Sequence, residues 1–234
     1  MTIAEVVALW PWLLAGLLLL ALILLWRQAG KAAEIEWEHG WMNHLDGLNR
    51  LLCRRYHRLH HDHIELPAQG PAILVANHIS GLDPLLLFAA SRRKLRFLIA
   101  TEQYNRFGLR WLFHAVGCIP VDRSGRPERA FRDALRALRE GEVVALFPHG
   151  KIHLDTDPPR RLKGGAARLA QLADCPIYPV RIEGVRAQGK IFRPVFLRAR
   201  AHLYNRPVLD CHEVSPRDCL QRLEPLLAPP GEGK

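Results

Sequence analysis

Hydrophobic and polar positions divide the chain into three stretches with different patterns. The first, residues 6–26, is apolar throughout and contains no charged side chain. A helix of this length, with a rise of about 1.5 Å per residue, would span the roughly 30 Å hydrocarbon core of a bilayer. Trp10, Trp12 and Trp26 lie near the two ends, where indole rings favour the headgroup region. The pattern predicts a transmembrane anchor over residues 1–26.

A cleaved signal peptide is the alternative interpretation of this run. Such a peptide has a basic start and a shorter apolar core, whereas this start carries Glu5 and no Lys or Arg. We therefore favour the anchor. All Lys and Arg residues follow the run, beginning with Arg27 and Lys31. By the positive-inside rule, a single-pass protein with its catalytic domain on the cytoplasmic side is expected.

The second stretch, residues 27–63, has apolar positions at three- and four-residue steps, which is typical of an amphipathic helix. These positions are Trp41, Leu45, Leu48, Leu52, Tyr56 and Leu59. Much of the remaining surface is arginine: Arg50, Arg54, Arg55 and Arg58. The predicted connector helix either lies in an anionic membrane interface or packs on the following domain, and both can hold.

The end of the connector is rich in histidine, which raises the question of a metal site. His57 and His61 have helical ligand spacing, but no Cys or Glu completes a recognisable set. We expect a solvated or headgroup-facing cluster and no metal.

The third stretch, residues 64–228, alternates short apolar runs with helical patterns. The predicted strands are residues 72–76, 95–100, 118–121, 143–147, 177–182 and 197–204. The predicted helices are residues 84–90, 106–116, 127–140, 164–173 and 215–227. This alternation indicates a single α/β domain with a mixed, largely parallel sheet flanked by helices. Residues 229–234 are expected to be a disordered tail.

Composition restricts the partners and the compartment. A formal net charge of +10 favours anionic partners, namely nucleic acid, anionic lipid headgroups or phosphorylated substrates. The five cysteines are scattered and include no Cys-x-x-Cys pair. We therefore expect reduced thiols in a cytosolic setting rather than a disulfide framework.

Candidate chemistry lies directly after the first predicted strand of the α/β domain. The segment Asn77-His78-Ile79-Ser80-Gly81-Leu82-Asp83 ends before Pro84, which favours a helix start. A His and an Asp held on such a connection suggest a general base, His78, that is oriented by Asp83. The alternative is a polar turn with a capping Asp and an incidental His.

Three further stretches end or open predicted strands with polar or rigid residues: 117–123, 147–151 and 175–180. The ends of strands in an α/β sheet gather functional groups at one edge. Arg123, in the first of these stretches, suits a phosphate because its guanidinium donates two parallel hydrogen bonds. Taken alone, Arg123 fits a surface arginine better than a phosphate ligand.

Together, the four stretches resemble the conserved blocks of the glycerolipid acyltransferases, the lysophosphatidic acid (1-acyl-glycerol-3-phosphate) acyltransferase family. NHISGLD matches the family's His-x-x-x-x-Asp block, GCIPVDR the second block, FPHG the third and CPIYPV the fourth. Their order and intervals agree over about residues 64–185. The resemblance also covers the basic, Gly-containing stretch 157–167.

The resemblance implies acyl transfer from acyl-coenzyme A or acyl-carrier protein to the hydroxyl of a lysophospholipid. His78 would take the hydroxyl proton, and Asp83 would fix the imidazole. Arg123 would hold the acceptor's phosphate, and Asn77, His149, Gly150 and Lys151 are expected at the substrate. The resemblance implies no metal and no bound organic cofactor. Its partners would be these substrates and membrane lipids.

One position departs from the family pattern. The third block normally reads Phe-Pro-Glu-Gly, and His149 replaces the glutamate. A protonated His149 would add positive charge beside the acceptor and change the preferred headgroup, for example to that of a lyso-aminolipid. Alternatively, His149 only replaces one hydrogen-bond partner. A non-catalytic, membrane-tethered anion binder is a third hypothesis, but no nucleic-acid module accompanies the charge, so no nucleic-acid partner is expected.

Overall fold

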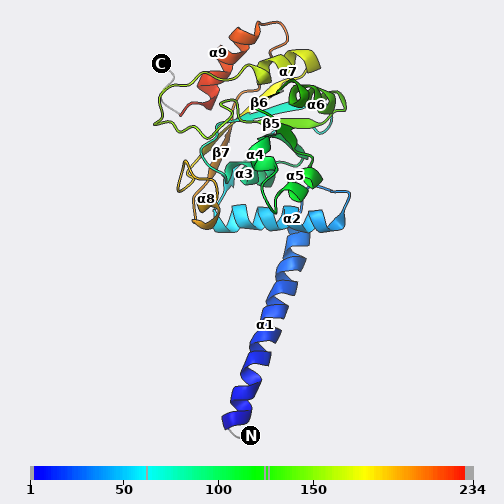
Figure 1. Cartoon of the computed structure of the whole chain (residues 1–234), viewed down its shortest axis with the longest axis vertical. Coiled ribbons are helices and arrows are strands. Elements are labelled where there is room, and N and C mark those ends of the chain that lie inside the picture. Colours follow the sequence, from blue (N-terminus) through cyan, green and yellow to red (C-terminus); the bar gives the residue numbers. More distant parts are fainter. Residues whose placement is uncertain (1–2, 62, 124, 126, 230–234) are drawn as a thin grey trace. The chain divides into compact units, whose positions relative to one another are not determined.

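The computed structural model describes residues 3–61, 63–123, 125 and 127–229, without the side chains of residues 3–9 and 61. It divides into two compact units, residues 1–52 and residues 53–234. Figure 1 labels the helices and strands of both units. The predicted tail falls almost wholly outside the described residues.

The first unit contains the apolar run within α1 (Ile3–Ala32). Residues 10–32 form a helix of 23 residues, with a mean hydropathy of 1.9, that is long and apolar enough to cross a membrane. The helix continues six residues beyond the predicted end at Trp26. Its basic end, including Arg27 and Lys31, follows the apolar run without a break in the helix.

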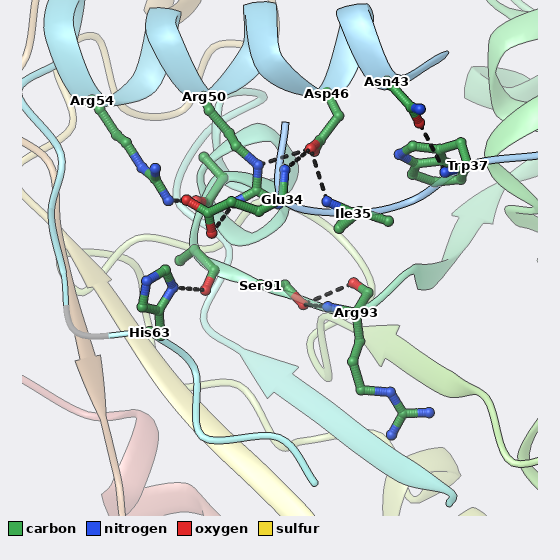
Figure 2. A network of polar contacts seen from close by, with 12 residues as sticks. Glu34, Ile35, Trp37, Asn43, Asp46, Arg50, Arg54, His63, Ser91 and Arg93 are labelled. Atoms are coloured by element: carbon green, nitrogen blue, oxygen red, sulfur yellow. Dashed lines mark hydrogen bonds and ion pairs between the residues drawn. The ribbon is translucent and has the colours of Figure 1, made fainter. Parts of the chain in front are cut away.

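A polar network joins the end of α1 to α2 (Gly40–Leu51) within this unit (Figure 2). Asp46 accepts hydrogen bonds from the backbone N–H groups of Glu34 (3.0 Å) and Ile35 (3.3 Å) and from Arg50 Nε (2.9 Å). Arg50 also pairs with the Glu34 carboxylate at 3.0 Å. A Cβ at Gly47 would lie 1.7 Å from the Ala29 carbonyl oxygen, so only glycine permits this helix contact.

The predicted connector is not one continuous helix. It contains α2, a short π-helix η1 (Leu52–Tyr56) and a two-residue strand β1 (His60–His61). Arg50 is fully buried in its ion pairs, so it is not available to lipid as the sequence interpretation supposed. His57 is also buried, with Nε2 3.2 Å from the Val195 carbonyl oxygen, and burial lowers its pKa. The prediction of a solvated histidine cluster is therefore wrong for His57.

The second unit is built on a seven-stranded sheet with the order β1-β7-β6-β2-β5-β3-β4. Its further strands are β2 (Ala72–Ala76), β3 (Leu95–Ala100), β4 (Ile119–Val121), β5 (Val143–Leu146), β6 (Ile177–Glu183) and β7 (His202–Asn205). Strands β2 to β6 are all parallel, and β7 runs antiparallel to β6. The predicted mixed, largely parallel sheet is confirmed.

Helices cover both faces of this sheet, which explains the continuous apolar runs of the central strands. One face packs on α3 (Asp83–Ala90) and α5 (Arg110–Val116), after the short α4 (Thr101–Tyr104). The other packs on α6 (Pro127–Arg139), α7 (Gly165–Ala173) and α9 (Pro216–Leu227), as Figure 1 shows. Successive residues of β2 alternate between the two cores, so β2 lies at the centre.

Two sequence expectations fail near the C-terminus. The predicted strand at 197–204 begins only at His202, and the preceding residues contain the short helix α8 (Arg193–Phe196). Pro194 favours the start of α8, which ends directly before the predicted strand. In addition, Cys211 and Cys219 form a buried disulfide with a Cα–Cα distance of 5.5 Å, which joins α9 to the preceding loop. The other three cysteines are free and buried, so the expectation of five thiols is wrong.

Candidate active site

The segment 77–83 connects the carboxyl end of the central strand β2 to α3. Asn77 is buried, and its side chain bonds both backbone groups of Ile182. Asn77 Nδ2 donates to the Ile182 carbonyl at 3.0 Å, and Asn77 Oδ1 accepts from the Ile182 N–H at 2.7 Å. It thereby joins the ends of β2 and β6. The structure gives Asn77 this structural role, because its side chain is buried and bonded to Ile182, and the expected substrate contact stays a prediction.

His78 and Asp83 are paired, with 2.8 Å between His78 Nδ1 and Asp83 Oδ2. A carboxylate only accepts hydrogen bonds, so the pairing places the imidazole proton on Nδ1 and leaves the Nε2 lone pair available. Nε2 has no hydrogen-bond partner among the described residues, and 18% of the His78 side chain is exposed. The arrangement offers a base that a substrate can reach.

Asp83 is fully buried and accepts three further hydrogen bonds. They come from the backbone N–H groups of Ile79 (2.7 Å) and Ser80 (2.8 Å) and from Ser80 Oγ (2.6 Å). These donors precede α3, and Leu82 is the N-cap without a side-chain bond. Asp83 therefore folds the loop back on itself; it does not cap the helix as the sequence suggested. Four donors to one carboxylate fix its position against His78.

The third motif lies beside this pair because β5 is the neighbour of β2. The Phe147 ring stacks on the His78 ring with centroids 4.0 Å apart and planes 12° apart. The His153 N–H donates to the His78 carbonyl at 2.7 Å. Sequence analysis did not assign Phe147 a role; its signal is a large aromatic residue at the end of the neighbouring strand.

His149 is half-buried, and its Nδ1 has no partner among the described atoms. Burial, together with the nearby His153 and Arg160, lowers the pKa of His149 to about 4. Its ring centroid lies 4.3 Å from that of His153. His149 is thus neutral near pH 7, and the site does not gain the extra positive charge that a protonated imidazole would bring.

Gly150 has a φ of 72°, a left-handed conformation that favours glycine. A Cβ there would lie 2.6 Å from Lys163 Nζ, so a larger residue would displace the end of this flexible side chain. The Lys163 N–H donates to the Pro148 carbonyl at 2.9 Å, which brings this ammonium to the third motif. Lys151 is exposed next to it.

Arg123 follows β4 at the same edge of the sheet as His78, and it is exposed. Three strand spacings separate β2 from β4, or about 14 Å. The structure therefore does not bring Arg123 into contact with the His78–Asp83 pair. The cavity beside β4, about 700 Å³, is lined by Gly117–Pro120 of the second motif but not by Arg123.

Fold and site together define an α/β protein with a His–Asp pair at the carboxyl edge of a parallel sheet. A family model described as "Acyltransferase" matches residues 57–183, which is more than half of the chain. The chain belongs to the acyltransferase family.

Curated relatives agree with this assignment. N-acylphosphatidylethanolamine synthase of Arabidopsis thaliana is 32% identical over 124 residues, 49% of this chain and 43% of that protein. The 1-acyl-sn-glycerol-3-phosphate acyltransferase of Bacillus subtilis is 24% identical over 129 residues, 55% of this chain and 63% of that protein. The 1-acyl-sn-glycerol-3-phosphate acyltransferase of Streptococcus pneumoniae is 28% identical over 128 residues, which are 53% of this chain and 47% of that protein. The chain spans about half the length of these relatives.

The fold has a solved counterpart. The crystal structure of the 1-acyl-sn-glycerophosphate (LPA) acyltransferase PlsC from Thermotoga maritima superposes with a TM-score of 0.62 at 18% identity. The match covers 80% of this chain and 79% of that one. At this identity the likeness establishes the fold.

Proposed function

We propose that this protein transfers a fatty acyl group from an acyl thioester to the hydroxyl of a lysophospholipid. The observation that carries the proposal is the His78–Asp83 pair, in which a buried carboxylate holds Nδ1 and leaves Nε2 open. The names of the bacterial relatives support a lysophospholipid as the acceptor.

In the proposed step, the acceptor hydroxyl oxygen attacks the thioester carbonyl carbon while His78 Nε2 takes its proton. The resulting tetrahedral intermediate collapses, the carbon–sulfur bond breaks, and the thiolate takes a proton from the imidazolium. The products are an oxygen ester and a free thiol. Asp83 stabilises the imidazolium between the two stages. The step uses no metal and no bound cofactor, and the donor is acyl-coenzyme A or acyl-carrier protein.

The preferred acceptor is 1-acyl-glycerol-3-phosphate. A neutral His149 supports this choice, because the replacement for the family glutamate then adds no charge beside the acceptor. Arg123, exposed at the same sheet edge, remains the proposed phosphate partner. It would reach the phosphate across the carboxyl ends of β5 and β3.

An aminolipid acceptor is the second candidate. It is favoured by the similarity to N-acylphosphatidylethanolamine synthase and by the missing family glutamate. The chemistry at His78 would be the same, with an amine or a lyso-aminolipid hydroxyl as the nucleophile.

The test is an assay of the purified full chain with labelled acyl-coenzyme A or acyl-carrier protein and a panel of lysolipids. Products are separated by headgroup. His78→Ala should lose roughly 10²- to 10⁴-fold in turnover, the usual contribution of a general base. Undiminished turnover in this variant would overturn its role. A strong preference for lysophosphatidic acid would exclude the aminolipid candidate, and labelled aminolipid as the main product would exclude the first.

We also propose a single-pass membrane protein with residues 53–234 on the cytoplasmic side, supported by the charge that follows α1. The Cys211–Cys219 disulfide favours the opposite side, because disulfides are rare in a reducing cytosol. Protease protection of a C-terminal tag in oriented vesicles decides between the two.

A further inference from the structure

The second unit has an exposed apolar surface that the acyl-transfer step does not use. It consists of two segments, one formed by the α4–α5 loop with the first turn of α5 and the other around α8. Its exposed side chains are Phe107, Trp111, Ile191, Phe192 and Phe196, which we call the aromatic surface. Phe107 is 102% exposed and Phe196 is 74% exposed. Large side chains clustered in this way mark a contact surface more often than isolated exposed ones.

The two segments of the aromatic surface are in contact. The guanidinium carbon of Arg106 lies 4.3 Å from the centroid of the Phe192 ring, which is a cation–π geometry. Residues 79, 81, 189 and 190 connect the surface to the catalytic loop. The Gly81 N–H donates to the Lys190 carbonyl at 3.0 Å, and the Gly189 N–H donates to the Ile79 carbonyl at 2.8 Å.

Formal charge within the two segments of the aromatic surface is of one sign. Residues 184–200 contain no Asp or Glu and five basic residues: Arg186, Lys190, Arg193, Arg198 and Arg200. Residues 103–117 also lack Asp and Glu and contain Arg106 and Arg110. Exposed aromatic side chains framed by cations are typical of segments that lie at a bilayer with anionic lipid. A protein partner with a neutral surface would not need this excess of charge.

A basic pocket adjoins the aromatic surface. It has a volume of about 430 Å³ and is lined by Arg58, Gly184, Arg186, Arg198, Ala199 and Arg200. None of its four guanidinium groups is paired with a carboxylate among the described residues. Arg198 lies two residues after Phe196. The Tyr56 hydroxyl, two residues before Arg58 in the chain, donates to the Phe196 carbonyl at 2.7 Å. Unpaired arginines around a hollow fit a phosphate group.

We propose that the aromatic surface and this arginine pocket form a membrane-contact site for bilayers that contain anionic lipid. The aromatic side chains enter the boundary between headgroups and acyl chains, and the pocket binds a headgroup phosphate. Through Gly81 and Gly189, the contact holds the His78 loop at the level where lysolipids lie. The inference goes beyond the proposed function, since it concerns neither the acceptor nor the donor and places a lipid contact on the catalytic unit itself.

The test uses the full chain in vesicles and reads depth, not activity. Phe107→Cys and Phe192→Cys variants carry a fluorophore, and the vesicles contain brominated phosphatidylcholine with or without phosphatidylglycerol. Leu172→Cys on α7 is the control, because Leu172 is exposed and α7 packs on the other face of the sheet. The three free cysteines are buried and resist labelling.

Bromine should reduce the fluorescence at positions 107 and 192 more than at 172, and phosphatidylglycerol should increase that loss. The double variant Arg198→Gln/Arg200→Gln should remove the increase, whereas Arg129→Gln/Arg132→Gln, the same charge change on α6, should keep it. Equal quenching at all three positions would overturn the membrane contact. The phosphate pocket would be overturned if phosphatidylglycerol did not increase the quenching. It would also be overturned if neither double arginine variant changed that increase. No outcome depends on acyl transfer, so failure here is separate from failure of the proposed function.

Discussion

The clearest test of the site is Asp83→Asn, which keeps the shape of the side chain and removes its charge. The Asp83 carboxylate accepts four hydrogen bonds, three on Oδ2 and one on Oδ1. An asparagine retains one acceptor oxygen for the three donors on the Oδ2 side. Its amide group then meets Ser80 Oγ, which must turn to accept. The change should therefore lower the stability of the loop and also reduce the stabilisation of a His78 imidazolium.

Hydrogen bonds to a charged group contribute about 1.5–3 kcal/mol, and neutral ones about 0.5–1.5 kcal/mol. A loss of roughly 1 kcal/mol at each of three retained bonds gives about 3 kcal/mol. For a unit of this size, that decrease in the free energy of unfolding corresponds to a drop in Tm of about 6–12 °C. Because Nδ1 can still donate, the expected loss of kcat/KM is about 10²-fold, smaller than that of His78→Ala.

The assay pairs thermal unfolding of the purified full chain with initial rates of acyl transfer. Ser80→Ala is the matched control, because it removes the Ser80 Oγ bonds to Asp83 and to the Leu82 N–H but keeps the His78–Asp83 pair. It should lower Tm by several degrees and turnover by less than about tenfold. A parent-like kcat/KM in Asp83→Asn would refute the orienting role. An unchanged Tm would refute the four-bond account of the loop.

Three further predictions concern packing, pH and redox state. Gly81→Ala should lower both Tm and turnover, because the new Cβ would lie 2.0 Å from the Ile191 carbonyl oxygen; a parent-like Tm would show that the two loops separate without cost. Between about pH 7 and about pH 4.5 the parent should lose Tm on acidification, because the unfolded chain binds a proton at His149 while burial holds the folded pKa at about 4. His149→Gln should reduce this loss of Tm. If the parent shows no such loss, the buried neutral imidazole is refuted. Thiol titration of the unfolded, unreduced protein should give three free thiols, and reduction should cost roughly 2.5 kcal/mol for a loop this short. A titration of five would contradict the Cys211–Cys219 disulfide.

The sequence was a good guide wherever local pattern and local chemistry coincide. Strands β2 and β3 have the predicted bounds, because each apolar run is followed directly by polar residues, Asn77 after β2 and Thr101 after β3. His78 and Asp83 were found together because one loop of seven residues holds both. Residues that act across the sheet carried a weaker signal. Asn77 was expected at the substrate, and only its bonds to Ile182, 105 residues away, show what it holds.

Long-range packing also decided the charge states. An arginine on a predicted amphipathic face is normally solvated, but Arg50 is buried because Glu34 and Asp46 meet it where two helices pack. His149 was ambiguous in the sequence, since its protonation depends on burial and on His153 and Arg160. No pattern of spacing reports desolvation.

By itself, the sequence determined the apolar membrane-length helix, the α/β class, and the loop that carries His78 and Asp83. The helix and the loop are encoded locally, by hydrophobic run and motif spacing, and the α/β class by the alternation of periods along residues 64–228. Only the tertiary structure decided that Phe147 stacks on His78, that His149 is neutral and that Cys211 meets Cys219. It alone brought the aromatic segments around Phe107 and Phe192 together and joined the second segment to the loop that carries His78. These features depend on which segments pack together, and strand order and burial are properties of the folded chain as a whole.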